Sequence, residues 1–125
     1  MDKKRIVVVD DSMTVVKFVS FTLKNKGYEV ITACDGMDAM EKISGADGDI
    51  SMVITDLNMP NVDGYTLIGT LRNDEAHRET PIIILSSEED SEDRERGMEV
   101  GATSYLVKPF RPDTLLAEVT KYIDG

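Results

Sequence analysis

Five short apolar runs rich in β-branched residues constrain the fold of this chain more than any other feature. They span residues 6–9, 28–33, 52–55, 82–85 and 105–107. Most of these runs lack regular polar alternation, which is typical of strands buried on both faces of a parallel sheet. Helical patterns lie between the runs, so the sequence predicts an α/β fold of five strand–helix units with helices flanking the sheet.

The helical patterns have recognisable starts and stops. The first is expected over about residues 12–26, where Gly27 ends it. Its core face is expected to hold Val15, Phe18, Val19, Thr22 and Leu23. Further helices are predicted after the Asp35-Gly36 turn, after Asp63 as a capping residue, over about 91–100, and from Pro112. The pattern over 91–100 is the least amphipathic, so this helix is expected to be the most mobile. Four methionines are predicted to be packing residues: Met13, Met37, Met40 and Met98.

The composition indicates one soluble domain. With 125 residues the chain has the size of a single compact domain, and residues 1–125 are expected to form it without an effector domain. The single cysteine permits no internal disulfide, and no apolar stretch approaches the length of a membrane span, so a cytoplasmic protein without membrane insertion is expected. A formal net charge of −10 disfavours nucleic acid as a direct ligand, since such a surface repels the phosphate backbone.

Chemically useful side chains follow four of the apolar runs. Asp10 and Asp11 follow the first run, Asp56 follows the third, Ser86 the fourth and Lys108 the fifth. In open parallel sheets ligands bind outside the carboxyl ends of the strands, so these residues are expected to converge on one rim. Taken alone, Ser86 is a common strand-end residue and Lys108 is a common surface residue. The combination of three carboxylates, a hydroxyl and an ammonium is what indicates magnesium-dependent phosphoryl transfer.

The expected roles follow from the residue types. Adjacent Asp10 and Asp11 offer hard oxygen ligands for Mg²⁺, and the three carboxylates are expected to repel one another until a cation binds. Asp56 is the expected nucleophile, because a carboxylate can accept a phosphoryl group and form an aspartyl phosphate. Lys108 and Mg²⁺ would stabilise the phosphoryl oxygens, and Ser86 would donate a hydrogen bond to one of them.

Five motifs together resemble the response-regulator receiver family, and within it the stand-alone chemotaxis regulators of the CheY type. They are Val9-Asp10-Asp11-Ser12, Asp56-Leu57-Asn58-Met59-Pro60 with Asp63-Gly64, Ile84-Leu85-Ser86-Ser87, Gly101-Ala102 and Lys108-Pro109-Phe110. These motifs occur in the family's order and span essentially the whole chain. The resemblance implies a flavodoxin-like three-layer sandwich whose parallel five-stranded sheet has the order 2-1-3-4-5.

The same resemblance implies a complete reaction site. Asp11, Asp56 and the backbone carbonyl of Asn58 would bind Mg²⁺, with Asp10 acting through water and with Mn²⁺ able to substitute. Asp56 would take a phosphoryl group from the phosphohistidine of a histidine kinase and later lose it by autodephosphorylation. The protein would then be a signalling phosphoacceptor rather than an enzyme. The peptide bond between Lys108 and Pro109 is expected to be cis, as is usual in the family.

Other positions in the motifs imply regulation. Asn58 and Glu88 match the positions that tune hydrolysis of the acyl phosphate, and the pair is similar to that of fast-cycling chemotaxis regulators. Tyr105 matches the aromatic residue that turns inward when the Ser86 hydroxyl moves to the phosphoryl group. The face formed by the fourth helix, the fifth strand and the fifth helix is expected to change and to bind a downstream protein. The flagellar motor or another signalling protein is the expected class of partner.

Two other interpretations remain. One is that the chain is a receiver domain taken from a larger regulator or a hybrid kinase. The other is a magnesium-dependent phosphohydrolase of the haloacid dehalogenase type, which also uses an aspartate at the end of a strand. The sequence disfavours this enzyme, because it needs a second aspartate two residues after the nucleophile, and Asn58 stands at that distance from Asp56.

Overall fold

The computed structural model describes residues 3–46, 49–59, 61–87 and 89–123, which form five strands and five helices in strict alternation. In chain order they are β1 (Arg5–Val9), α1 (Met13–Asn25), β2 (Glu29–Ala33), α2 (Gly36–Ser44), β3 (Met52–Asp56), α3 (Gly64–Arg72), β4 (Ile82–Ser87), α4 (Ser91–Val100), β5 (Ser104–Lys108) and α5 (Pro112–Ile123). The predicted strand–helix units are therefore confirmed. Of the helices in the described ranges, none combines the length and the apolar character that crossing a membrane requires.

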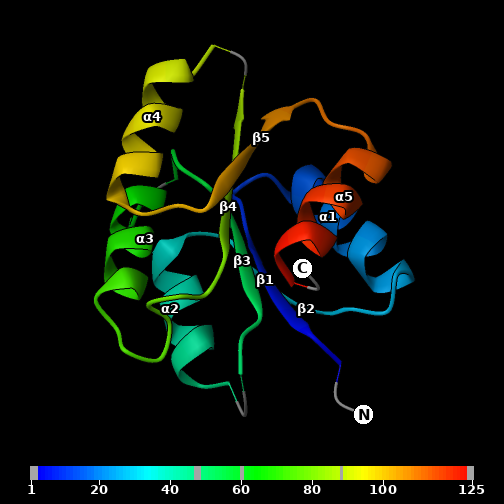
Figure 1. The fold of residues 1–125 in the computed structure, drawn as a ribbon, viewed down its shortest axis with the longest axis horizontal. Helices are drawn as coiled ribbons and strands as arrows, with labels where there is room; N and C mark the ends of the chain where they lie inside the picture. Colours follow the sequence, from blue (N-terminus) through cyan, green and yellow to red (C-terminus); the bar gives the residue numbers. More distant parts are fainter. Residues whose placement is uncertain (1–2, 47–48, 60, 88, 124–125) are drawn as a thin grey trace.

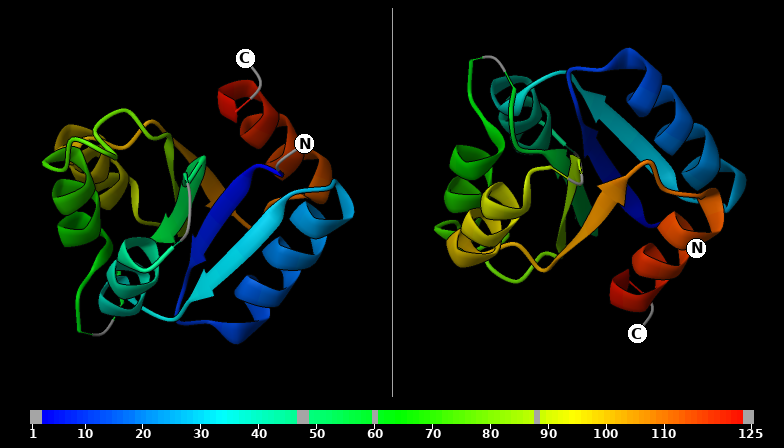
Figure 2. Two further views of the ribbon diagram at one scale, coloured as in Figure 1. Left: turned by 90° about the horizontal axis from the view of Figure 1, so that it is seen from below. Right: turned by 90° about the horizontal axis from the view of Figure 1, so that it is seen from above.

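The five strands form one parallel sheet between two layers of helices. Neighbouring strands pair in the order β2-β1-β3-β4-β5. Figure 1 shows the sheet close to edge-on, with α2, α3 and α4 on one side and α1 and α5 on the other. The two end views of Figure 2 show the same layers enclosing a twisted sheet. The three-layer sandwich and its strand order are thus confirmed, and the carboxyl ends of β1 and β3 are neighbours.

Each central strand sends alternate side chains into two separate cores, one on each face of the sheet. On β1, Val7 and Val9 pack with residues of α2 and α3, whereas Ile6 and Val8 pack with residues of α1 and α5. All four side chains are fully buried. Burial on both faces explains why the central runs are continuously apolar instead of alternating.

Helix α1 packs through a face slightly different from the predicted one. Val19 and Leu23 are fully buried as expected, but Val16 is buried in place of Phe18, which is 38% exposed. Phe18 lies instead against the ring of Phe110, with 5.8 Å between the ring centroids. A helical period fixes an apolar stripe only to within about one residue, so packing against the neighbouring elements selects the face.

Three of the four methionines predicted to pack in the core lie at the surface instead. Met13, Met37 and Met98 are 62%, 50% and 36% exposed. Met40 is half-buried and packs against the core on the α2 side of the sheet. Met13 and Met37 lie in the first turns of α1 and α2, next to the open rim of the sheet, where fewer core residues are available to cover them.

Helix α4 has the shallowest packing of the five. Gly97 is its only fully buried residue. A Cβ atom placed on Gly97 would lie 2.5 Å from Ile84 Cδ1 and 3.4 Å from Leu57 Cδ2, so the missing side chain lets the helix approach β4 closely. The weak amphipathicity expected of this helix is confirmed, while its mobility stays a prediction.

Arg72, the last residue of α3, joins three segments at the end of the sheet away from the predicted site. Its guanidinium donates hydrogen bonds to five acceptors, namely the backbone carbonyls of Gly101 (2.8 Å), His77 (3.1 Å), Arg78 (3.1 Å) and Thr80 (2.7 Å) and the hydroxyl of Thr103 (3.3 Å). Burial lowers the pKa of Arg72. Because a single guanidinium group donates hydrogen bonds to carbonyls of both loops, Arg72 holds the loop before β4 and the loop after α4 against α3.

Replacing Arg72 with Ala is expected to lower the free energy of unfolding by about 2–4 kcal/mol, since half-buried carbonyls lose a charged donor. Arg72→Lys is expected to recover little of this loss, because an ammonium cannot reproduce the planar fork. Urea denaturation measures both variants. Arg78→Ala, at an exposed position of the same loop, serves as the control and is expected to change stability by less than about 0.5 kcal/mol. Equal losses of stability in the Arg72 and Arg78 variants would contradict this role of the Arg72 guanidinium.

Candidate functional site

The register of the sheet brings the predicted site residues to one rim. Val9 pairs with Thr55, so the residues that follow them, Asp10 and Asp56, are neighbours at the ends of β1 and β3. Asp56 in turn pairs with Leu85, one residue before Ser86 on β4. On the other side of β4, Ser87 pairs with Lys108 at the end of β5. The convergence expected from the sequence follows from this parallel register.

Asp10, Asp11 and Asp56 form a compact acidic cluster. Each offers one carboxylate oxygen, and these oxygens all lie within 4.8 Å of one another. Asp10 is 1% exposed, Asp56 is half-buried and Asp11 is exposed, so the cluster opens to solvent on the Asp11 side. Asp10 Oδ1 accepts a hydrogen bond from the amide of Ser12 (2.9 Å), the residue that caps α1.

Lys108 supplies the positive charge next to this cluster. Its Nζ atom lies 3.1 Å from Asp10 Oδ2 and 3.8 Å from Asp56 Oδ2. The peptide bond between Lys108 and Pro109 is cis, as the resemblance implied. One ammonium thus faces two of the three carboxylates, which leaves the cluster with a net negative charge that a further cation can neutralise.

Asp56 is held in an environment that disfavours its charged form. Burial raises its pKa above the ordinary value, and the negative charge of Asp10 adds to this rise. The positive charge of Lys108 and the amide groups of Leu57 and Asn58 act in the opposite direction. The amide of Leu57 donates to Asp56 Oδ1 at 2.7 Å, so one carboxylate oxygen is fixed by the backbone while Oδ2 faces Lys108.

The loop between β3 and α3 is held against the site by contacts that sequence reasoning missed. Asn61, whose φ is +64°, donates a side-chain hydrogen bond to Asp35 Oδ2 at 2.7 Å. Asp35 is 7% exposed and also caps α2, and its pKa is lowered by the amide of Asp38 first and by Asn61 second. Gly64 is required on the other side of this loop, because a Cβ atom there would overlap the carbonyl oxygen of Asp56.

The sequence marked Asp35 as a turn residue and gave no signal that it pairs with Asn61, 26 positions later. Such a contact depends on two loops meeting at the rim. It positions the segment that carries Asn58, whose side chain is exposed. The Asp35–Asn61 contact therefore supports the site without belonging to the acidic cluster.

Ser86 and Tyr105 lie on the α4 side of the rim. Ser86 is 3% exposed, whereas Tyr105 is 45% exposed on the edge strand β5. Arg94 of α4, for which the sequence predicted no role, reaches both of them. Glu88, predicted to tune hydrolysis, lies outside the described residues.

The donor set suits a small, hard divalent cation. The cluster consists of carboxylate oxygens, it is accessible through Asp11, and its negative charge exceeds what Lys108 neutralises. Magnesium is typically bound by one or two carboxylates together with several waters, which an open cluster permits. The residues present therefore fit the ion that the sequence predicted.

Comparison with known proteins agrees with this geometry. The family model described as response regulator receiver domain matches residues 6–120. The chain belongs to the response regulator receiver family. Protein PilG of Pseudomonas aeruginosa is 38% identical over 122 residues, which cover 98% of this chain and 89% of PilG.

Solved structures extend the similarity to three dimensions. The chemotaxis response regulator CheY4 of Vibrio cholerae superposes with a TM-score of 0.89 at 38% identity, covering 97% of this chain and 99% of CheY4. The receiver domain of a sensor histidine kinase from Pseudomonas aeruginosa superposes with a TM-score of 0.89 at 27% identity, covering 99% and 100%, and has a magnesium ion coordinated in its active site cleft.

This chain is accordingly a receiver domain of a two-component system, a class of signalling protein that takes phosphoryl groups from histidine kinases. Receiver domains bind Mg²⁺ at an aspartate cluster, and Asp10, Asp11 and Asp56 form such a cluster here. The haloacid dehalogenase interpretation is not favoured.

Replacing Asp56 with Asn is expected to raise the melting temperature in metal-free buffer at pH 7 by a few degrees. The raised pKa means that the folded state holds the Asp56 proton more tightly than the unfolded chain does. The associated stability is therefore present below the unfolded pKa and is lost as the pH rises through the folded pKa, so an ionised Asp56 destabilises the fold at pH 7.

Calorimetry of both proteins measures this effect, and their melting temperatures are expected to converge as the pH falls. Glu99→Gln removes one carboxylate from the exposed surface of α4 and controls for net charge. Added Mg²⁺ is expected to stabilise the wild type more than the Asp56→Asn variant. If Asp56→Asn melts below the wild type at pH 7 without metal, the ionised carboxylate does not destabilise the fold.

Proposed function

We propose that Asp56 is the phosphoacceptor of this receiver domain. The placement of its carboxylate carries the proposal: Oδ1 accepts the amide hydrogen bond of Leu57, and Oδ2 faces the ammonium of Lys108. The carboxylate is thereby oriented at the open rim, next to the cluster with Asp10 and Asp11. Among the three aspartates of the cluster, Asp56 is the half-buried one, and the amide of Leu57 fixes one of its oxygens.

In the proposed transfer, a carboxylate oxygen of Asp56 attacks the phosphorus atom of a phosphohistidine. The bond between phosphorus and the imidazole nitrogen breaks, and the nitrogen keeps the electron pair. Lys108 neutralises charge on the phosphoryl oxygens, and Ser86 donates a hydrogen bond to one of them. When bound at the acidic cluster, Mg²⁺ would supply additional positive charge for the transfer.

We further propose Asp11, Asp56 and the carbonyl of Asn58 as direct metal ligands, with Asp10 acting through water. The contacts of Asp10 support this division, because Oδ1 already accepts from Ser12 and Oδ2 already faces Lys108. Asp11 is exposed, and within the described residues its carboxylate has no hydrogen bond or ion pair that would compete with a cation. Mn²⁺ is proposed to substitute, since it binds the same oxygen ligands.

Asn58 and Glu88 are proposed to set the lifetime of the aspartyl phosphate. The exposed side chain of Asn58 lies two residues beyond Asp56, where a polar group can admit and orient an attacking water. A lifetime of seconds to minutes is proposed by analogy with fast-cycling regulators. Hydrolysis returns the free carboxylate, and beyond this self-catalysed cycle we propose no enzymatic activity.

Phosphorylation is proposed to change the face formed by α4, β5 and α5. Movement of the Ser86 hydroxyl toward the phosphoryl group would vacate space beside the β4–α4 loop, into which the exposed ring of Tyr105 can turn. Shallow packing of α4 through Gly97 supports this, since an element with few buried contacts shifts at low cost.

The proposed partners follow from this cycle. A histidine kinase is the phosphoryl donor, and a downstream protein binds the changed face in the cytoplasm. Relatives named for chemotaxis support a motility target such as the flagellar motor, or another signalling protein. A receiver domain within a larger regulator or hybrid kinase is the alternative, and the receiver of a sensor histidine kinase is among the similar structures. Direct binding of nucleic acid or insertion into a membrane is not proposed.

Incubation with acetyl phosphate and Mg²⁺ is expected to phosphorylate Asp56 and no other residue. Borohydride reduction converts the acyl phosphate to a stable product, which mass spectrometry of peptides can locate. Asp56→Asn is expected to abolish the modification, whereas Glu99→Gln leaves it unchanged. Modification at another residue, or none in a folded wild type with Mg²⁺ present, would refute the assignment.

Beryllofluoride, which mimics the phosphoryl group, is expected to alter amide exchange in residues 89–107 and in α5. The expected cause is the loss of resting contacts around Ser86 and Tyr105. Exchange followed by mass spectrometry, with and without beryllofluoride, measures the change, and α2 on the far edge of the sheet serves as an internal reference. Changes limited to the acidic cluster would exclude the proposed switch.

A further inference from the structure

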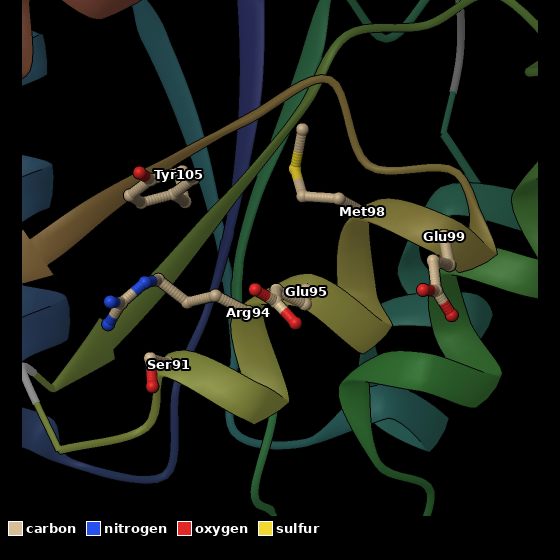
Figure 3. A pocket seen from close by; sticks show the side chains of 6 residues that line it. All are labelled: Ser91, Arg94, Glu95, Met98, Glu99 and Tyr105. Carbon is tan, nitrogen blue, oxygen red and sulfur yellow. The ribbon is translucent and has the colours of Figure 1, made fainter.

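Arg94 contacts both residues of the proposed switch, Ser86 and Tyr105, in the resting structure. Its Nη1 atom donates hydrogen bonds to Ser86 Oγ at 3.4 Å and to the Ser87 carbonyl at 2.8 Å. Its guanidinium carbon lies 5.2 Å from the centroid of the Tyr105 ring. Figure 3 shows the side chain reaching from α4 toward Tyr105 across a pocket. This pocket is lined by Ser91, Arg94, Glu95, Met98, Glu99 and Tyr105.

These three contacts of the Arg94 guanidinium all involve elements that the proposed switch moves. Ser86 supplies the hydroxyl that must reach the phosphoryl group, Ser87 is the last residue of β4 before the loop into α4, and Tyr105 is the ring that turns inward. Within the described residues, none of the side-chain ion pairs involves Arg94. The carboxylate one turn earlier, Asp90, instead accepts a hydrogen bond from the Ser87 hydroxyl at 2.6 Å.

We propose that Arg94 is a positioning residue that holds Ser86, Ser87 and Tyr105 in their resting arrangement and thereby opposes phosphorylation of this domain. The inference rests on the proposed function, because it concerns the same switch. It adds a restraint that acts before any phosphoryl group arrives. A helix that packs shallowly through Gly97 needs such a restraint to keep one resting position.

The direction of the effect follows from linkage. Contacts that are present in the resting state and lost in the phosphorylated state stabilise the resting state alone. They therefore weaken the binding of every ligand that selects the phosphorylated state. Arg94 loses its place beside Ser86 Oγ when the hydroxyl turns toward the phosphoryl group. It also loses the ring face of Tyr105 when the tyrosine turns inward. Removing the guanidinium is therefore expected to favour the phosphorylated arrangement.

If Arg94 bound the phosphoryl group, its removal would have the opposite effect on beryllofluoride affinity. Because the guanidinium lies within hydrogen-bond distance of Ser86, it could instead move to the phosphoryl oxygens and bind them directly. In that case its removal would weaken phosphoryl binding. Two observations favour the restraint: the Ser87 carbonyl holds Nη1 at the shorter distance, and the guanidinium lies over the ring of Tyr105.

The test compares beryllofluoride binding, with Mg²⁺ present, in the wild type and three variants of the full chain. Arg94→Ala is expected to bind beryllofluoride about threefold to tenfold more tightly, the size expected when one partly exposed charged hydrogen bond no longer opposes binding. Arg94→Lys keeps the charge and the aliphatic stem but loses the planar guanidinium. Its affinity for beryllofluoride is expected to lie between those of the wild type and Arg94→Ala. NMR titration of isotope-labelled protein measures the affinities.

Arg96→Ala is the matched control. Arg96 lies two residues farther along α4 and places its guanidinium carbon 4.2 Å from the centroid of the Tyr65 ring on the α3 side. Its removal takes away the same charge and a similar ring contact from the same helix without touching Ser86, Ser87 or Tyr105. It is expected to leave beryllofluoride affinity within about twofold of the wild type.

A second readout separates positioning from a purely structural role. In Arg94→Ala without beryllofluoride, the side-chain signals of Tyr105 are expected to shift toward their beryllofluoride-bound positions, and the initial rate of phosphorylation by acetyl phosphate is expected to rise. A residue that only stabilises the fold would not raise either quantity when removed. Circular dichroism confirms that each variant is folded.

Tighter binding in Arg94→Ala with no change in Arg96→Ala supports the proposal. Unchanged or weaker binding in a folded Arg94→Ala overturns it, and weaker binding together with a shorter phosphoryl lifetime assigns Arg94 to the phosphoryl group instead. The wild type distinguishes this failure from a failure of the proposed function. If the wild type itself neither binds beryllofluoride nor is phosphorylated on Asp56, the receiver site is wrong and the inference falls with it.

Discussion

The structure depends most on how it accommodates three carboxylates whose oxygens lie within 4.8 Å of one another, with one lysine beside them. Like charges at that separation repel, and burial of Asp56 raises its pKa further. The fold tolerates the cluster because two buried strands end side by side and backbone amides hold the carboxylates. A cation or a phosphoryl group at the rim therefore acts on a site that is electrostatically unbalanced in its resting state.

The two sides of the rim are held by different kinds of contact. On the side of α2 and α3, the Asp35–Asn61 contact and the close approach at Gly64 fix the loop that follows Asp56. On the opposite end of the sheet, Arg72 ties three segments together. On the side of α4, packing is shallow and the restraint comes from polar contacts of Arg94. The shallow packing of α4 is consistent with the proposal that a change at the cluster moves α4 and β5.

The sequence predicted the elements well where burial alone decides them. The continuous apolar runs marked the strands, and Ser12, Asp63 and Pro112 marked helix starts that the structure confirms. The predictions were wrong where a side chain lay near the edge of a core. Phe18 and Met37 have the same hydrophobicity as buried residues, but the helix face and the nearness of the rim leave them exposed.

The sequence by itself determined the fold class, the rim at which Asp10, Asp56, Ser86 and Lys108 lie at or next to strand ends, and the family to which the chain belongs. These features depend on local patterns and on the rule that parallel strands end at one edge. Only the tertiary structure decided that Asn61 holds Asp35 and that Arg94 reaches Ser86, Ser87 and Tyr105. Such contacts join loops and helices that no local pattern relates, because a polar side chain finds its partner only after the chain around both has packed.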